Sequence, residues 1–146
     1  MPTAAKLVAA LSFAFLAFVT CTVLQGTLPE GKRIGHAYEV SAICALLVGW
    51  FVSGAARRGS YAEAAATGLR TTTTGVAASL LVLSVGTMWT IATRGLYKGP
   101  LEAILDIFSK FLEFGGLLLP IAVLGTLFFG GMLAGMATEW AGRRWR

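Results

Sequence analysis

The side chains best suited to bind a ligand follow one another at residues 70–74, where one arginine precedes four threonines. A guanidinium and neighbouring hydroxyl groups can bind an oxyanion, because all of them donate hydrogen bonds. The candidate anion contacts are Arg70, Thr71 and Thr74. The alternative is that the threonine hydroxyls donate to carbonyls of their own helix while Arg70 extends to water. The sequence favours this alternative, since the run lies inside a predicted helix and not at its N-terminus.

The other reactive side chains are few and scattered. His36 is the only histidine, and Glu39 lies one helical turn away. One histidine with scattered carboxylates does not make a transition-metal site. Cys21 and Cys44 lie in two different apolar segments, and the sequence leaves open whether they interact. We find no grouped nucleophile, base or metal ligands, so we expect no catalytic residues, no metal, no cofactor and no enzymatic activity.

Long apolar runs separate these side chains. Hydrophobic residues make up 56% of the 146 residues and charged residues only 13%, whereas soluble domains carry about 25% charged residues. About 20 apolar residues in a helix cross the hydrocarbon core of a bilayer. The predicted spans are residues 7–28, 39–56, 71–93 and 115–138. The sequence therefore predicts a single all-α domain over residues 1–146, built as a four-helix transmembrane bundle.

Two further helical features flank the third predicted span. Ser60 and Glu63 form the pattern of a capping box, so the third helix should start near Ser60, ahead of the apolar run. Residues 100–113 alternate charged and apolar side chains at three- and four-residue spacing. Such an amphipathic helix should lie flat in the membrane interface, just before the last span.

The basic residues predict the orientation of the chain. Four crossings put both termini on one side, and that side would carry the whole formal net charge of +5. The positive-inside rule places it in the cytoplasm. Arginine and tryptophan side chains at span ends should anchor the helices, and anionic lipid is the partner that they predict, not nucleic acid. The predicted anchors are Trp89, Trp140, Trp145, Arg57, Arg58, Arg143 and Arg144.

Small residues form stripes on two of the predicted spans. Ala45, Gly49 and Ser53 recur at four-residue steps, and Gly131 and Gly135 form a GxxxG pattern. Such stripes let helix backbones approach closely. They predict either packing among the spans of this chain or a docking face for a second copy or another transmembrane subunit. The sequence favours packing within the chain, because any compact bundle needs small residues.

Short sequence segments along the whole chain resemble those of the TrgA family, bacterial membrane proteins associated with tellurium resistance. The resemblance lies in residues 1–10 (MPTAAKLVAA), 39–40 (EV), 46–50 (LLVGW, chiefly its GW end), 99–103 (GPLEA), 130–135 (GGMLAG) and 139–146 (EWAGRRWR). These segments carry no chemistry, so the resemblance transfers no catalytic or binding residues. It implies a small multi-pass protein of the bacterial inner membrane that is linked to resistance against tellurium oxyanions.

Three functions follow from these observations. The first is a non-enzymatic inner-membrane protein of the tellurium-resistance type, acting through helix–helix association or through membrane handling of oxyanions. The second is an accessory transmembrane subunit of a larger photosynthetic or respiratory complex. The third is a small transporter or channel, which the absence of charged residues and histidine from the middle of the predicted spans disfavours.

Overall fold

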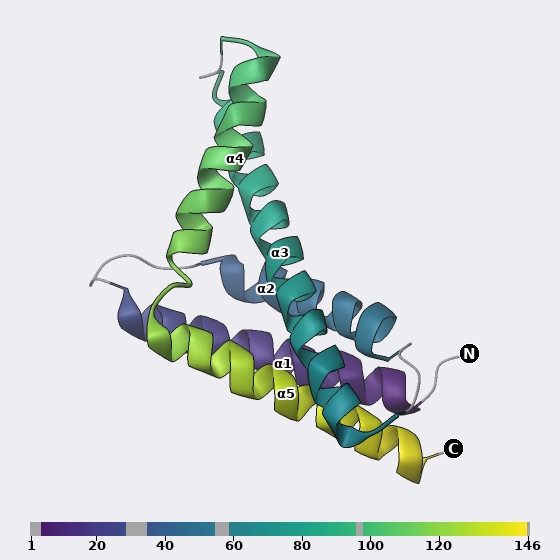
Figure 1. The fold of residues 1–146 in the computed structure, drawn as a ribbon. Coiled ribbons are helices and arrows are strands. Elements are labelled where there is room, and N and C mark those ends of the chain that lie inside the picture. The colour runs from purple at the N-terminus through teal and green to yellow at the C-terminus, as the bar shows by residue number, and fades with distance from the viewer. Residues whose placement is uncertain (1–3, 29–34, 55–58, 96–97, 146) are drawn as a thin grey trace.

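A computed structural model describes residues 4–28, 35–54, 59–95 and 98–145. In this part of the chain all regular elements are helical (Figure 1). The elements are α1 (Ala4–Thr27), α2 (Ala37–Val48), a π-helical turn η1 (Gly49–Ser53), α3 (Tyr61–Thr93), α4 (Pro100–Gly116) and α5 (Ile121–Arg144). The predicted all-α class is confirmed.

Three helices are long and apolar enough to cross a membrane, over Ala5–Thr27, Tyr61–Thr93 and Ile121–Arg144. The predicted second span is only partly matched. It corresponds to α2 and η1, which form one apolar segment of 12 and 5 residues, about 26 Å of helix, against a core of about 30 Å. Residues 55 and 56 of that prediction lie outside the described part. The four-span bundle is therefore not confirmed in full.

Helix α3 begins where its capping box predicts. The Ser60 side chain accepts from the Glu63 amide at 3.2 Å, and the Glu63 carboxylate accepts from the Ser60 amide at 3.1 Å. Each residue thus satisfies a backbone donor that the first helical turn leaves without a partner. The helix then continues over 33 residues to Thr93, a length of about 50 Å.

The last two helices differ from their predicted limits. Helix α4 runs on to Gly116, and α5 covers Ile121–Arg144 in place of the predicted 115–138. Pro120 explains the boundary, because proline has no amide to donate to the Gly116 carbonyl and would break a continuous helix. Pro120 becomes the N-cap of α5, with an extended ψ of 132°.

The helices form two parts that meet near the middle of α3 (Figure 1). Helices α1 and α5 lie side by side and antiparallel, so the start of α1 and the end of α5 share one end of the molecule. Helix α2 packs on α1, and α3 crosses α5 in its first half. The second half of α3 and the returning α4 then leave this layer as a projecting hairpin, which we call the α3–α4 hairpin.

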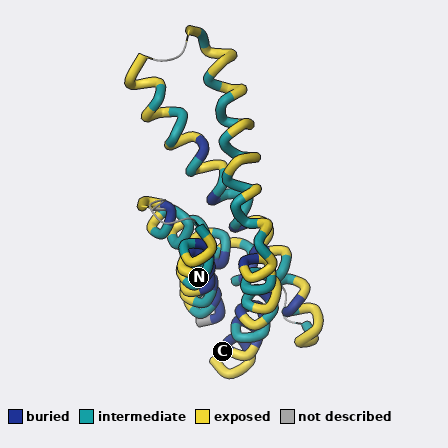
Figure 2. Tube along the Cα trace, turned by 90° about the vertical axis from the view of Figure 1, so that its left-hand side faces the viewer, coloured by how far each residue is buried: buried dark blue, intermediate teal, exposed yellow. Residues whose placement is uncertain are grey.

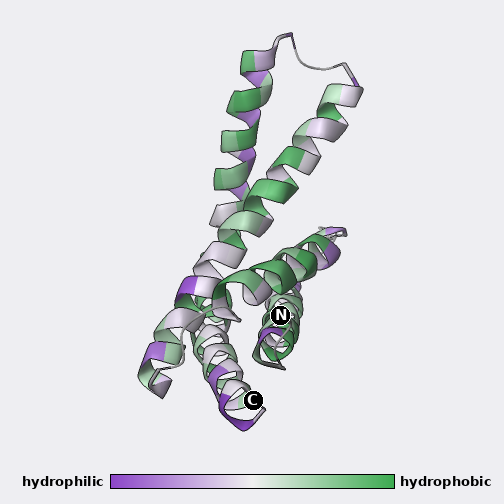
Figure 3. Cartoon of the chain, turned by 90° about the vertical axis from the view of Figure 1, so that its right-hand side faces the viewer, coloured by the Kyte–Doolittle hydropathy of each residue, from purple (hydrophilic) through white to green (hydrophobic). Residues whose placement is uncertain are grey.

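Helix α4 is amphipathic as predicted, but its neighbour is a helix of the same chain. It packs along α3, and its more hydrophilic side faces α3 while an apolar side faces outward (Figure 3). The Lys110 ammonium donates to the Glu113 carboxylate at 2.7 Å, which raises the pKa of Lys110. Helix α4 is thus one arm of the hairpin, packed on α3, and its place in the membrane interface stays a prediction.

Figure 2 shows that only short stretches of each helix are buried. Many of the buried residues are small, and many of the large apolar residues are exposed. Among the described residues, the largest side chains that are fully buried are Val123, Thr71 and Ser84. Phe15 and Phe51, in contrast, are each 70% exposed. Burial of this kind suits helices surrounded by hydrocarbon, where large apolar side chains gain nothing by turning inward and close backbone contact supplies the attraction.

Candidate functional site

Helices α3 and α5 cross where their glycines meet. A Cβ atom on Gly68 would overlap the Gly131 carbonyl oxygen, and one on Gly135 would overlap the Ala64 carbonyl and lie 2.9 Å from Gly68 Cα. Gly131 also faces the Thr72 hydroxyl. The predicted stripe of Gly131 and Gly135 is thus buried against α3 in the same chain.

The second predicted stripe packs mainly against α1. A Cβ atom on Gly49 would lie 2.9 Å from the Ala9 carbonyl oxygen and 3.1 Å from the Phe13 ring. Ala45 packs against the buried cluster of Phe13, Leu16 and Ala134. Ser53 is buried as well. Both stripes therefore have partners within the chain, as the packing alternative predicts.

The threonine run does not converge on a single site. Each of the four hydroxyls donates to the carbonyl four residues earlier, at 2.8 to 3.0 Å. The prediction that the threonine hydroxyls bond to carbonyls of their own helix is therefore confirmed. Thr71 is buried, whereas Arg70 and Thr74 are exposed. The structure thus does not bring the three predicted anion contacts together.

One predicted anchor, Arg143, joins two helices. Its Nε donates to the Glu139 carboxylate at 2.8 Å, and another of its nitrogens donates to the Gly59 carbonyl. The guanidinium also lies 4.6 Å from the centre of the Tyr61 ring. Arg143 therefore ties the end of α5 to the start of α3. The sequence predicts Arg143 at a helix end but gives no signal for its contacts with Gly59 and Tyr61, because these residues lie more than 80 positions earlier.

The other predicted anchors have simpler surroundings. The Arg144 guanidinium lies 5.6 Å from the Trp140 ring, and Trp140 meets Trp145 edge to face at 6.0 Å. Trp89 is exposed near the end of α3. Arg57 and Arg58 lie outside the described residues.

The two thiols and the histidine have different contacts. Cys21 and Cys44 are both free, and the Cys21 sulfur lies 3.9 Å from the Ala37 carbonyl, seven residues before Cys44. The His36 Nδ1 lies 3.7 Å from the Glu39 carboxylate, and both side chains are exposed. In the part of the chain that the structure describes, no group of three histidine, cysteine or acidic side chains is placed to hold a metal ion.

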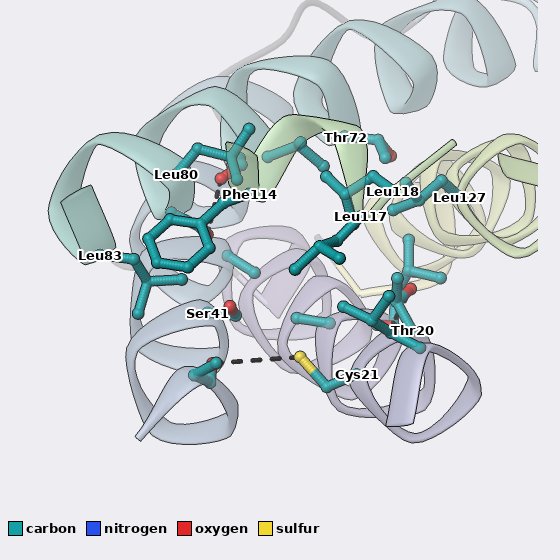
Figure 4. Close-up of a pocket in the computed structure, with 18 of the residues that line it drawn as sticks. Thr20, Cys21, Ser41, Thr72, Leu80, Leu83, Phe114, Leu117, Leu118 and Leu127 are labelled. Carbon is teal, nitrogen blue, oxygen red and sulfur yellow. Dashed lines mark hydrogen bonds between the residues drawn. The ribbon is translucent and has the colours of Figure 1, made fainter. Parts of the chain in front are cut away.

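The site that sequence reasoning missed is a central cavity of about 420 Å³ (Figure 4). Its walls come from α1, α2, the middle of α3, the end of α4 and the turn that follows it, and Leu127 of α5 adds a further side chain. Phe114, Leu117 and Leu118 cover one side of it, facing Thr20 and Cys21 of α1. No periodic pattern could have predicted it, because the cavity exists only where the α3–α4 hairpin leaves the helix layer.

Searches of family models, curated proteins and solved structures return no match to this chain. The class of protein therefore follows from the structure. Three long apolar helices, small residues at the helix crossings and large apolar residues on the outside indicate a helical membrane protein.

Proposed function

We propose that this chain is a non-enzymatic multi-pass protein of the bacterial inner membrane that acts through helix–helix association. Its role would be in resistance to tellurium oxyanions, as the resemblance to the TrgA family implies. The observation that carries the association is the outer face of the α3–α4 hairpin. Five large apolar side chains of α4 are between 53% and 72% exposed there: Leu101, Ile104, Leu105, Phe108 and Leu112.

This face differs from the small-residue stripes. Those stripes pack between helices of the chain, so they are not free to receive another protein. The α4 face has aromatic and branched side chains and no partner helix among the described residues. In a bilayer such a face contacts lipid or the helix of another membrane protein, and close packing with a helix adds dispersion contacts.

A deletion strain tests the proposed role. We expect its tellurite tolerance to fall and to return when the wild-type gene is supplied. We expect no rescue by a double variant, Phe108→Ala with Leu112→Ala, although the protein reaches the membrane in normal amounts. The matched control is Leu11→Ala with Phe15→Ala, because these side chains are equally exposed but lie on α1. Unchanged tolerance in the deletion strain would rule out the resistance role.

The second candidate is an accessory subunit of a larger membrane complex, of the photosynthetic or respiratory kind. The same exposed hairpin favours it, because an arm that leaves the helix layer can reach a neighbouring subunit (Figure 1). Gentle extraction from the native membrane, followed by sizing and identification of co-purified proteins, separates the two candidates. The subunit function would be supported if the wild-type protein is found in a large complex and the variant Phe108→Ala with Leu112→Ala is not. A wild-type monomer that still confers normal tellurite resistance would exclude the subunit function.

A further inference from the structure

The central cavity is more apolar than its residue types suggest. Thr20, Thr71, Thr72 and Ser79 all line it, but each hydroxyl donates to the carbonyl four residues earlier in its own helix, at 2.8 to 2.9 Å. Each donor proton is thereby used within a helix. These residues therefore present mainly carbon to the cavity, and the remaining walls are largely leucine, alanine and phenylalanine.

Such a space is poorly suited to water. A buried water needs about two to four polar partners. The hydroxyls of Thr20, Thr71, Thr72 and Ser79 already donate within their own helices, so none of these four needs a water to accept its proton. The volume of about 420 Å³ is nevertheless that of a ligand pocket. A space of this size left empty would forfeit the dispersion contacts of all its walls.

The position of the cavity indicates the shape of its occupant. Its α1 lining runs from Phe13, near the middle of the helix, to Leu24, near the end. Eleven residues of helix rise about 17 Å, which is close to half of a hydrocarbon core of about 30 Å. The α3 lining, from Thr71 to Leu83, has a similar length. The stretch of each helix that lines the cavity is thus about as long as one leaflet of a bilayer is thick.

The end of the cavity near Leu24 is also where polar groups begin. Gly35 and His36 line it there, at the start of α2, and the His36 side chain is exposed. A ligand lying in the cavity would therefore have its apolar part between α1 and α3 and its polar end beside His36. Lipids have this distribution of polarity.

We infer that the cavity binds one acyl chain of a membrane lipid, taken from the leaflet that surrounds the end of α1 and the start of α2. The chain would fill the angle between the helix layer and the α3–α4 hairpin and would hold the two parts together. This inference is independent of the proposed function, because it rests on the cavity walls and not on the outer face of α4.

Native mass spectrometry of the full-length protein tests the inference. The protein is reconstituted with a phospholipid and washed in detergent to remove surface lipid, and the mass of the intact complex is then measured. We expect wild type to keep one lipid. The Ala17→Phe variant, which places a ring in the cavity, should keep at least about tenfold less, a difference of about 1.4 kcal/mol. The matched control is Ala122→Phe, because Ala122 is exposed on α5 and does not line the cavity. Equal retention by all three proteins would overturn the inference.

A second measurement needs no substitution. The phospholipid carries a photoreactive diazirine on its acyl chain, and photolysis follows the detergent wash. We expect adducts on Thr20, Leu24 and Leu83, which line the cavity, and few on Phe15, which is exposed on α1. Adducts on Phe15 alone would contradict the inference.

The mass of the lipid that stays bound to protein purified from native membranes identifies the source of the acyl chain. A phospholipid or a free fatty acid would support the inference, and an isoprenoid would contradict it.

Discussion

Arg143 holds together two chain segments that are far apart in sequence. Its partners are the buried Glu139 carboxylate one turn earlier on α5, the Gly59 carbonyl and the Tyr61 ring. Glu139 is only 8% exposed, and the Arg143 guanidinium supplies the positive charge beside its carboxylate. A buried carboxylate without a partner costs free energy, so the pair matters more than two exposed charges would.

We therefore expect Arg143→Met to loosen the start of α3. The variant leaves the Glu139 carboxylate without its cation and the Gly59 carbonyl without its donor, so the contact between the end of α5 and the start of α3 should weaken. Hydrogen exchange should rise in the first turn of α3, which begins at Tyr61. Arg144→Met is the control, since the described contact of Arg144 is with Trp140 on its own helix. Equal exchange in both variants would contradict a special role for Arg143.

At the scale of the elements, α3 and α5 approach each other closely where they cross. Glycine is required there because the backbones themselves are in contact: a Cβ on Gly135 would overlap the Ala64 carbonyl. Helices in hydrocarbon lack a hydrophobic force that draws them together, so this contact depends on dispersion between closely packed backbones. One methyl group at the crossing separates the helices and weakens all of their contacts.

We expect Gly135→Ala to destabilise the protein by about 1–3 kcal/mol, the usual cost of overpacking. Gly125→Ala is the matched control, because it lies on the same helix and a Cβ there meets nothing within 4 Å. That control should be neutral or slightly stabilising, since alanine favours helix over glycine. Unfolding by SDS in mixed micelles measures the difference, and equal midpoints would show that the α3–α5 crossing is not tightly packed.

At the scale of the whole molecule, the start of α1 and the end of α5 lie at one end (Figure 1). This agrees with an even number of crossings, in which α2 and η1 pass through the membrane together with the three longer helices. The 17-residue segment Ala37–Ser53 can do so if the bilayer thins slightly around it or if flanking side chains reach the interface.

Reporter fusions test this arrangement. We expect reporters at residue 1 and at residue 146 to be active on the cytoplasmic side, where the arginines of the last turn belong. A reporter inserted at Lys98, in the turn of the α3–α4 hairpin, should be active on the opposite side. Termini on opposite sides would mean that α2 and η1 do not cross, and would leave three spans.

The sequence determined the class of the protein and much of its local structure. The absence of charge over long runs predicts apolar helices, and the hydrogen bonds of Ser60 and Glu63 are made between residues three apart, so a local pattern predicts the start of α3. The threonine hydroxyls are equally local. The TrgA resemblance and the tellurium role stay predictions, since they depend on what the protein does in a cell.

Only the tertiary structure decided where the helices meet. It placed Gly131 and Gly135 against α3, joined Arg143 to Gly59, turned α4 back along α3 and opened the central cavity. The physical reason is that apolar side chains around a whole helix leave no hydrophobic stripe to mark its inner face. In lipid, close packing between backbones that are far apart in sequence decides which face of a helix lies inside. The periodicity of one segment therefore does not predict the surface against which it packs.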